Sequence, residues 1–304
     1  MNECNIIKFA GYRTAAKLRV LQRFLHMRLG VIAGVFNRHH LQVSENGVTL
    51  KYAELEAVLF DIFFAAQRES SSQIDVEQST DLMINFLQNV FDRKASGSVE
   101  VFCVKVVLAV LSSAKLQEKY EYLFRQLADH NNCISSNKLE KILASLVHIS
   151  VYLNESTAFG FEQIPETVGS CFKQAGTLGI TEDIFIGWLL QEPQLLMWLP
   201  TLHRMQMGEM VHHTVKCSLC KLYPIVGLRF RCLECLRYNL CQMCFFTGKS
   251  NKRHKLQHPV QEYCYETSSC EKFAFLKMIK NKLCGSSCQL QYLSIQPHDV
   301  AFET

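Results

Sequence analysis

Four pairs of potential metal ligands follow one another between Cys217 and His258. A Cys-x-x-Cys turn holds two sulfur atoms at about 2.3 Å from one zinc ion, and a His-x-x-x-His turn presents two imidazoles on one side. The pairs are Cys217 with Cys220, Cys232 with Cys235, Cys241 with Cys244, and His254 with His258. Eight ligands suffice for two closed tetrahedral sites, so the sequence predicts two zinc ions with a structural role.

The spacing of these pairs does not say which pairs share an ion, because four pairs can be divided between two ions in three ways. In an interleaved arrangement, the first and third pairs hold one ion, and the second and fourth hold the other. In a sequential arrangement, each ion closes one local half of the segment. Ordinary buried cysteines are the alternative interpretation, but four regularly spaced pairs in so short a segment disfavour it.

The remaining composition favours metal binding over disulfide bonds for these cysteines. The N-terminus has no uninterrupted apolar core and no cleavage site, so no secretory signal is predicted. The longest apolar stretch, Val101 to Leu111, is interrupted by Lys105 and is shorter than the roughly 18 residues of a membrane span. We therefore expect no transmembrane segment and a reducing compartment, in which disulfides are rare.

Residues 1–210 show mainly helical periodicity. Apolar residues recur at three- and four-residue steps, which predicts amphipathic helices joined by short polar breaks. The expected helices are Tyr12–Leu29, Glu54–Phe64, Glu77–Phe91, Val101–Leu111, Lys119–Leu127, Leu139–Val147 and Asp183–Leu190. The predicted domains are 1–125 and 126–210, both helical, and 211–265, which contains the ligand pairs. No fold is assigned to residues 266–304.

Helix–break–helix units of this kind suggest EF-hands, whose loops need oxygen ligands at positions 1, 3, 5, 9 and 12 and glycine at position 6. One candidate loop begins at Asp92 and has Gly97 at position 6. Its position 3 is Lys94 and its position 12 is Cys103, so a cation and a thiol replace two oxygen ligands. We expect this loop not to bind calcium.

Two further candidate loops have the same defect. In the loop that begins at Asp129, Ile134 replaces the turn glycine and Cys133 replaces the oxygen ligand of position 5, although Glu140 stands at position 12. The stretch 173–184 has no carboxylate at its first position. The helical part is therefore expected to keep the EF-hand shape without binding calcium.

The order of these features resembles the cysteine-rich region of the dystrophin and dystrobrevin family. The motifs YRTAAKLR at Tyr12, VEQSTDLMINFL at Val76 and EPQLLMWLPTLHR at Glu192 are similar to the EF-hand region of that family, and Cys217–Cys264 resembles its ZZ-type zinc finger. The resemblance implies a mainly α fold of degenerate EF-hand helical pairs with a small zinc-stabilised cross-brace domain. It also implies the interleaved pairing: Cys217, Cys220, Cys241 and Cys244 for one zinc, and Cys232, Cys235, His254 and His258 for the other.

For function, the resemblance implies a non-catalytic adaptor that binds proteins of the dystrophin-associated complex type. Its expected location is cytoplasmic, peripheral at the plasma membrane. The sequence departs from the family in two respects. No WW domain precedes residue 1, which leaves dystroglycan binding an open question, and no heptad coiled coil follows residue 265.

Basic residues are concentrated around the predicted zinc finger. Nine Lys or Arg and two Glu lie between His212 and Glu262, so with six thiolates and two zinc ions the segment carries a net charge of +5. The formal charge of the whole chain, counted without thiolates and zinc ions, is +4. A solvated basic face is the simplest interpretation. The alternative is a surface for an acidic peptide or an anionic membrane. Nucleic acid is not expected, because the nearby aromatic residues lie among the ligands and are expected to fill the core.

Motifs of catalysis are missing from the sequence. It contains no Gly-rich phosphate loop, no Gly-x-Ser-x-Gly elbow and no His-Glu-x-x-His helix, so no enzyme is predicted. A RING finger is the competing cross-brace, and it would indicate a RING-like module of the ubiquitin pathway. RING fingers usually carry Cys-x-His in the middle and end on a Cys pair, whereas this segment has Cys-x-x-Cys in the middle and ends on a His pair.

Overall fold

A computed structural model describes residues 2–69, 74–92, 96–173 and 179–266 of the chain. Lys94 and the C-terminal segment 267–304 lie outside the described residues. The chain divides into two compact units: Thr14–Thr201 forms the helical unit, and Met1–Arg13 joins the chain from Leu202 onward in a second unit, called the finger unit below. The division into the domains 1–125, 126–210 and 211–265 stays a prediction.

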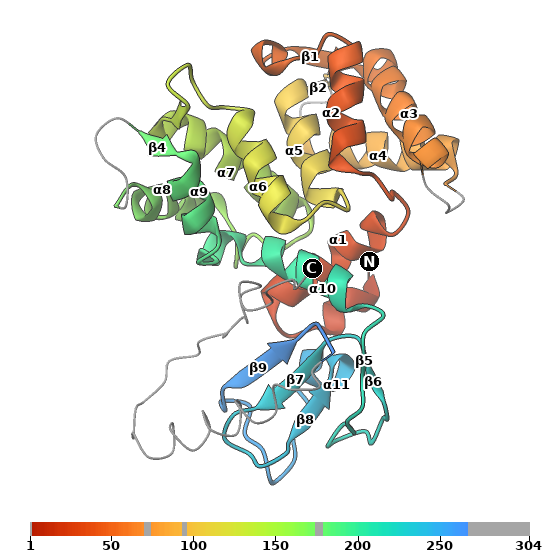
Figure 1. The fold of residues 1–304 in the computed structure, drawn as a ribbon, viewed down its shortest axis with the longest axis vertical. Helices are drawn as coiled ribbons and strands as arrows, with labels where there is room; N and C mark the ends of the chain where they lie inside the picture. Colours follow the sequence, from red (N-terminus) through yellow and green to blue (C-terminus); the bar gives the residue numbers. More distant parts are fainter. Residues whose placement is uncertain (1, 70–73, 93–95, 174–178, 267–304) are drawn as a thin grey trace, which may run out of the picture. The chain divides into compact units, whose positions relative to one another are not determined.

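The helical unit contains two groups of four helices (Figure 1). The elements of the first group are α2 (Leu29–Arg38), β1 (Thr49–Lys51), α3 (Tyr52–Glu69), α4 (Val76–Phe91), β2 (Ser98–Glu100) and α5 (Val101–Leu111). Those of the second group are α6 (Leu116–Arg125), β3 (Cys133–Ile134), α7 (Ser136–Tyr152), α8 (Ile164–Phe172), β4 (Ile180–Thr181) and α9 (Glu182–Leu189). Helices α1 (Ala10–Gln22) and α10 (Trp198–Gly208) each contain a boundary between the two units.

Each group has the arrangement of a pair of EF-hands, in which two loops are joined by a short antiparallel ladder. In the first group Leu50 pairs with Val99, and in the second Ile134 pairs with Ile180. All four side chains are buried. Apolar residues at the loop positions that face the core therefore join the two loops of each pair.

The predicted helix Tyr12–Leu29 is two helices in the structure. Helix α1 ends at Gln22, and Leu29 is the first residue of α2. Between them His26 has a φ of 35°, a left-handed conformation that a continuous α-helix does not allow. Periodicity missed the break because Leu25 is buried in the connecting segment as fully as a helical core residue would be.

Three lysines are buried in the helical unit, and each donates to a backbone carbonyl. Lys105 Nζ lies 2.7 Å from Asn46 Oδ1 and 3.2 Å from the carbonyl of Gln42. Lys119 Nζ donates to the carbonyl of Val110 at 2.8 Å. The third, Lys17, pairs with the buried carboxylate of Glu155 at 2.8 Å and donates to Leu153. These bonds satisfy ammonium groups that burial would otherwise penalise.

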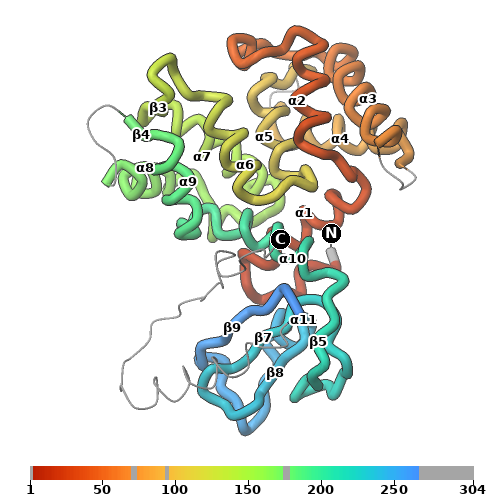
Figure 2. The backbone as a smooth tube through the Cα atoms, viewed as in Figure 1, coloured from red at the N-terminus to blue at the C-terminus, as the bar shows by residue number. Residues whose placement is uncertain are grey.

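The finger unit is built on small antiparallel sheets. Strand β7 (Arg229–Cys232) lies between β8 (Asn239–Cys241) and β9 (Val260–Tyr263), as the trace in Figure 2 shows. Strands β5 (His212–His213) and β6 (Ile225–Val226) pair separately, and the short helix α11 (Gln242–Phe246) follows β8. The stacked rings of Phe230 and Phe245, with centroids 3.8 Å apart, form the centre of its apolar core.

The N-terminal segment 2–13 packs against this core. Phe9 stacks on Phe245 with ring centroids 4.8 Å apart, and Tyr12 meets Phe230, Phe245 and Phe246. The hydroxyl of Tyr12 donates to the carboxylate of Glu262 on β9. A residue 250 positions away in the sequence thus belongs to the core of the finger unit.

A second set of contacts fixes the same segment. The N–H of Lys8 donates to the carbonyl of Phe246 at 2.8 Å. Arg204 of α10 pairs with Glu262 at 3.0 Å, so the carboxylate bound by Tyr12 is also neutralised.

The mainly helical fold with a small cysteine-rich finger confirms the predicted fold class. Within the described residues, no helix combines the length and apolarity that crossing a bilayer requires.

Candidate metal centre

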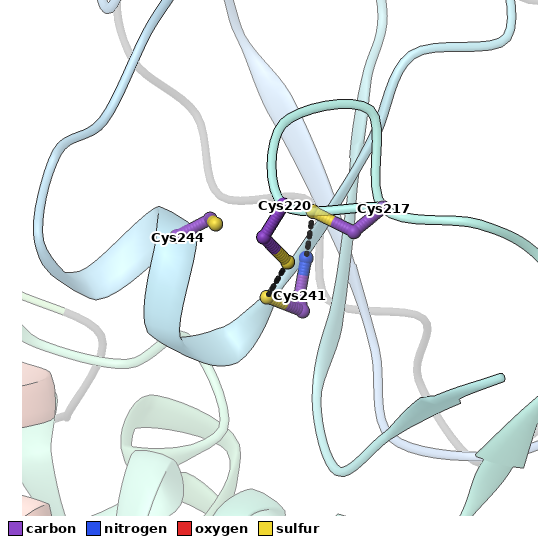
Figure 3. Close-up of side chains that lie close together, drawn as sticks. All are labelled: Cys217, Cys220, Cys241 and Cys244. Carbon is purple, nitrogen blue, oxygen red and sulfur yellow. Dashed lines mark hydrogen bonds between the residues drawn. The ribbon is translucent and has the colours of Figure 1, made fainter. Parts of the chain in front are cut away.

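The first cluster joins the first and third ligand pairs. Cys217 and Cys220 lie in the loop between β5 and β6, Cys241 ends β8, and Cys244 lies in α11 (Figure 3). Their sulfur atoms all lie within 4.8 Å of one another. Three of the four side chains are buried, and Cys220 is exposed. Segments before, within and after the β7–β8 hairpin are thereby brought to one point.

The second cluster joins the second and fourth pairs. Cys232 ends β7 and Cys235 lies in the following turn, while His254 and His258 lie between α11 and β9. These ligand atoms also lie within 4.8 Å of one another. Both imidazoles point Nδ1 towards the thiols: Cys235 Sγ lies 3.3 Å from Nδ1 of His258 and 3.7 Å from Nδ1 of His254.

These separations fit a tetrahedral zinc ion. With Zn–S near 2.3 Å and Zn–N near 2.0–2.1 Å, two thiolates lie about 3.8 Å apart and a thiolate and an imidazole nitrogen about 3.6 Å apart. In the first cluster, the sulfur atoms of Cys220 and Cys241 are 3.6 Å apart. In the second, Cys232 Sγ lies 3.6 Å from Nδ1 of His258. Each cluster therefore has the donor atoms and the size that zinc requires.

Burial and hydrogen bonds change the acidity of the thiols in opposite directions. Burial raises the pKa of Cys232 and of Cys244 to about 11, because a buried thiolate loses the solvation of its charge. The pKa of Cys217 falls to about 7, since N–H donors led by that of Cys241 outweigh the effect of burial. Four neighbouring thiolates repel one another, and a bound cation removes that penalty and holds the thiols deprotonated.

Further groups around the ligands orient them. The N–H of Cys235 donates to Cys232 Sγ at 3.2 Å, and that of Cys241 donates to Cys217 Sγ at 3.4 Å. Glu234 Oε2 lies 3.2 Å from Nε2 of His258, an arrangement that fixes the tautomer presenting Nδ1 to a metal. Sequence reasoning counted Glu234 only as one of two acidic charges, because nothing in its spacing relates it to His258.

The candidate calcium loops gather no comparable donor set in the part of the chain that the structure describes, where ligand atoms of three or more His, Cys, Asp or Glu residues meet only in the two clusters above. Asp92 accepts hydrogen bonds from Ser96 and from the N–H of Gly97 within its own loop. Cys103 of the same loop lies 3.8 Å from the hydroxyl of Ser145, and burial raises its pKa to about 11. The absence of calcium binding stays a prediction.

The nine basic residues between His212 and Glu262 divide into two groups. Arg229 and Arg231 on β7 are buried, and Arg229 donates to Asn239 Oδ1 at 2.9 Å and lies over the ring of Tyr263. The other seven of the nine basic residues are exposed. The basic surface expected from the sequence is therefore smaller than the count suggested, since two of its charges are part of the interior.

Comparison with known proteins places three family models along the chain. Residues 1–112 match a model described as EF hand, and residues 116–206 match a second one described as EF-hand. Residues 211–256 match the model described as zinc finger, ZZ type. With the Cys and His clusters, the third match supports zinc binding by this chain.

Curated relatives match nearly all of the chain but are much longer. Dystrophin isoform B of Drosophila melanogaster is 38% identical over 294 residues, which is 92% of this chain and 17% of that protein. Utrophin of Rattus norvegicus is 36% identical over 93% of this chain and 8% of that protein. Dystrophin-related protein 2 of Rattus norvegicus is 35% identical over 97% of this chain and 31% of that protein. The chain thus spans less than a third of the length of each.

Proposed function

The chain belongs to the dystrophin family through its EF-hand and ZZ zinc-finger regions, and we propose that it is a zinc-binding adaptor without catalytic activity. In this proposal it binds two zinc ions, one in each cluster, and no calcium. It binds partners of the dystrophin-associated type at the cytoplasmic face of the plasma membrane. The ubiquitin-pathway alternative is not favoured, because the finger matches the ZZ family.

The closed geometry of the two clusters supports a structural role, and not a catalytic one, for the proposed zinc ions. Each cluster has four protein ligands, so a tetrahedral ion would keep no position for water or substrate. Cys217, Cys220, Cys241 and Cys244 would hold one ion, and Cys232, Cys235, His254 and His258 the other. Each ion would link segments that lie apart in the sequence, and thereby stabilise a finger whose apolar core is small.

The zinc content tests this part of the proposal. Elemental analysis of the purified full chain should give two zinc ions per chain. Replacing Cys241 with Ser or His258 with Ala should each lower the content towards one, because the variants affect different clusters. One zinc ion in the unchanged protein, or the loss of both ions in each variant, would contradict two independent clusters.

An exposed group of cations supports the proposed partner chemistry. Four basic side chains lie between Cys244, the last ligand of the third pair, and His258, the last ligand of the fourth, and will be called the basic loop: Lys249, Lys252, Arg253 and Lys255. The backbone at both ends of the basic loop is held by hydrogen bonds to ligand residues: the N–H of Lys249 donates to the carbonyl of Cys244, and the N–H of His258 donates to the carbonyl of Lys255. A loop held in this way loses little conformational entropy on binding, so its charges favour an acidic peptide segment of a partner protein.

Binding of a fluorescent Glu-rich peptide to the full chain tests the basic loop. Reversing its four residues to Glu should abolish most of the binding, and raising the salt concentration should imitate the variant, because exposed charges are screened over about 8 Å at physiological ionic strength. The matched control reverses four exposed basic residues of the helical unit: Arg38, Lys51, Arg68 and Lys115. Equal effects of both variants would show that only net charge matters.

Two further arms separate the alternatives. The same assay is repeated with phosphatidylserine vesicles in place of the peptide. If reversing the basic loop weakens binding to the vesicles but not binding to the peptide, the target is a membrane surface. A ubiquitin discharge assay should show no activity, since an adaptor does not accelerate release from a conjugating enzyme. If neither the charge reversal nor added salt changes binding to the peptide or to the vesicles, the basic loop is only solvated surface and the proposal is wrong.

A further inference from the structure

The hairpin that β5 and β6 form in the finger unit carries exposed apolar side chains (Figure 1). Beyond the two strands the chain turns through Cys217 and Cys220, and Leu222 and Tyr223 follow this turn. Their side chains, called the hairpin tip below, are 47% and 63% exposed, and Val226 on β6 is also exposed. Neighbouring apolar residues that stay exposed in this way indicate a surface that contacts another molecule.

Hydrogen bonds hold the backbone of the hairpin tip in place. The N–H of Cys217 donates to the carbonyl of Leu222 at 2.9 Å, and the N–H of Lys221 donates to the carbonyl of Cys217 at 3.1 Å. The N–H of Ser218 donates to the carbonyl of Asn239 at 2.7 Å, which fastens the turn to β8. The tip therefore presents its apolar side chains on a fixed backbone, and little conformational entropy is lost when they bind.

The charges beside the hairpin tip are all of one sign. Lys216 and Lys221 are exposed, and the sequence has no Asp or Glu between Glu209 and Glu234. Lys221 Nζ donates to the carbonyl of Ser218 at 2.7 Å, so its charge stays next to the turn. An apolar tip flanked by cations matches an anionic bilayer, in which acyl chains accept the apolar side chains and headgroups attract the ammonium groups.

We propose that the hairpin tip inserts into the interfacial region of an anionic membrane, with Lys216 and Lys221 among the lipid headgroups. The aromatic ring of Tyr223 suits this depth, because Tyr is enriched where an apolar interior meets water. The inference deepens the proposed location at the plasma membrane and rests on it. It assigns the membrane to the hairpin tip and leaves the acidic peptide to the basic loop, so the finger unit would contact two targets through separate surfaces.

Tryptophan fluorescence of the full-length Tyr223→Trp variant tests the insertion. The two tryptophans of the chain, Trp188 and Trp198, are only 3% and 1% exposed, so an introduced tryptophan is the one that lipid can reach. The probe is a vesicle of phosphatidylserine mixed equally with phosphatidylcholine that carries bromine on its acyl chains. These vesicles should quench the introduced tryptophan and move its emission to shorter wavelength. Leu236→Trp, at another exposed position of the finger unit, is the matched control and should not be quenched.

Affinity for the same vesicles gives a second measurement. Replacing both Leu222 and Tyr223 with Ser should weaken binding about tenfold, because part of the free energy of transferring two apolar side chains is lost. Zinc content and peptide binding should not change, since both side chains are exposed. Replacing the exposed Leu236 and Met243 with Ser is the matched control. Replacing either of the two lysines with Gln should weaken vesicle binding about fivefold.

Three results would overturn the inference. If the vesicles bind the Tyr223→Trp variant without quenching it, the tip does not insert, although the proposed membrane location would stand. If the unchanged protein does not bind the vesicles, the inference fails too, whereas zinc content and the peptide assay still decide the adaptor proposal. If the emission of Tyr223→Trp moves to shorter wavelength with rising protein concentration and no vesicles, a second copy of the chain covers the tip.

Discussion

Replacing Tyr12 with Ala should destabilise the zinc finger from a position about 200 residues away from the first ligand. Tyr12 is buried, meets three aromatic rings of the finger core, and donates to Glu262. The substitution would remove these contacts and leave a carboxylate with one partner fewer. Since Ala is a good helix former, the local conformation of α1 should not suffer.

The expected loss of stability can be estimated from the contacts removed. Truncating a buried aromatic side chain to Ala typically costs about 3–5 kcal/mol. Replacing Tyr12 with Phe should cost less, about 1–2 kcal/mol, because the ring remains and only the hydrogen bond to a partly neutralised carboxylate is lost. The difference between the two variants therefore separates packing from hydrogen bonding.

The assay should report the finger unit and not the helices. Zinc release into a chromogenic chelator during urea denaturation meets this requirement, because both ligand clusters lie in the finger. Replacing Tyr52 with Ala is the matched control: this tyrosine is exposed in the helical unit, and its loss should change stability by less than about 0.5 kcal/mol. If Tyr12→Ala releases zinc no earlier than Tyr52→Ala, the N-terminal segment is not part of the finger core.

Three other predictions concern zinc, calcium and pH. Replacing Cys232 with Ser should release the zinc ion of the second cluster and unfold the part of the finger that this ion holds. It should leave most of the helical circular dichroism, because the core of the helical unit contains no ligand. Cys4→Ser is the control, and a general loss of helix in Cys232→Ser would refute separate folding. Millimolar calcium should leave the melting temperature of the protein unchanged, because Asp92 already accepts hydrogen bonds within its loop and Cys103 occupies position 12 of that candidate EF-hand loop. Calcium binding at micromolar concentration in calorimetry would contradict this prediction. Burial, and secondarily the charge of Arg19, lowers the pKa of Lys119 to about 7. Between about pH 7 and 10 the folded state therefore binds fewer protons than the unfolded state, so the free energy of unfolding rises with pH. Lys119→Met should remove this rise, about 2 kcal/mol between pH 7 and 9 in urea unfolding, and an equal pH dependence in both proteins would exclude Lys119 as its source.

Local features of this protein could be predicted from its sequence. The ligand pairs were found because a Cys-x-x-Cys turn is defined by neighbouring residues. Most helices were found because their apolar faces repeat at the helical period, and two of the candidate EF-hand loops because Asp92, Gly97 and Asp129 stand at positions that such a loop defines. The homology to dystrophin confirmed the family that these motifs indicated.

Features that depend on distant contacts required the tertiary structure. Spacing left three divisions of the ligand pairs open, and the hairpin that β7 and β8 form is what brings Cys217 beside Cys241 and Cys232 beside His258. Similarly, no local pattern relates Tyr12 to Glu262, or distinguishes the buried Arg229 from an exposed charge. Sequence periods reflect short-range backbone geometry, whereas these pairings are decided by the packing of the whole core, in which residues far apart in the sequence become neighbours.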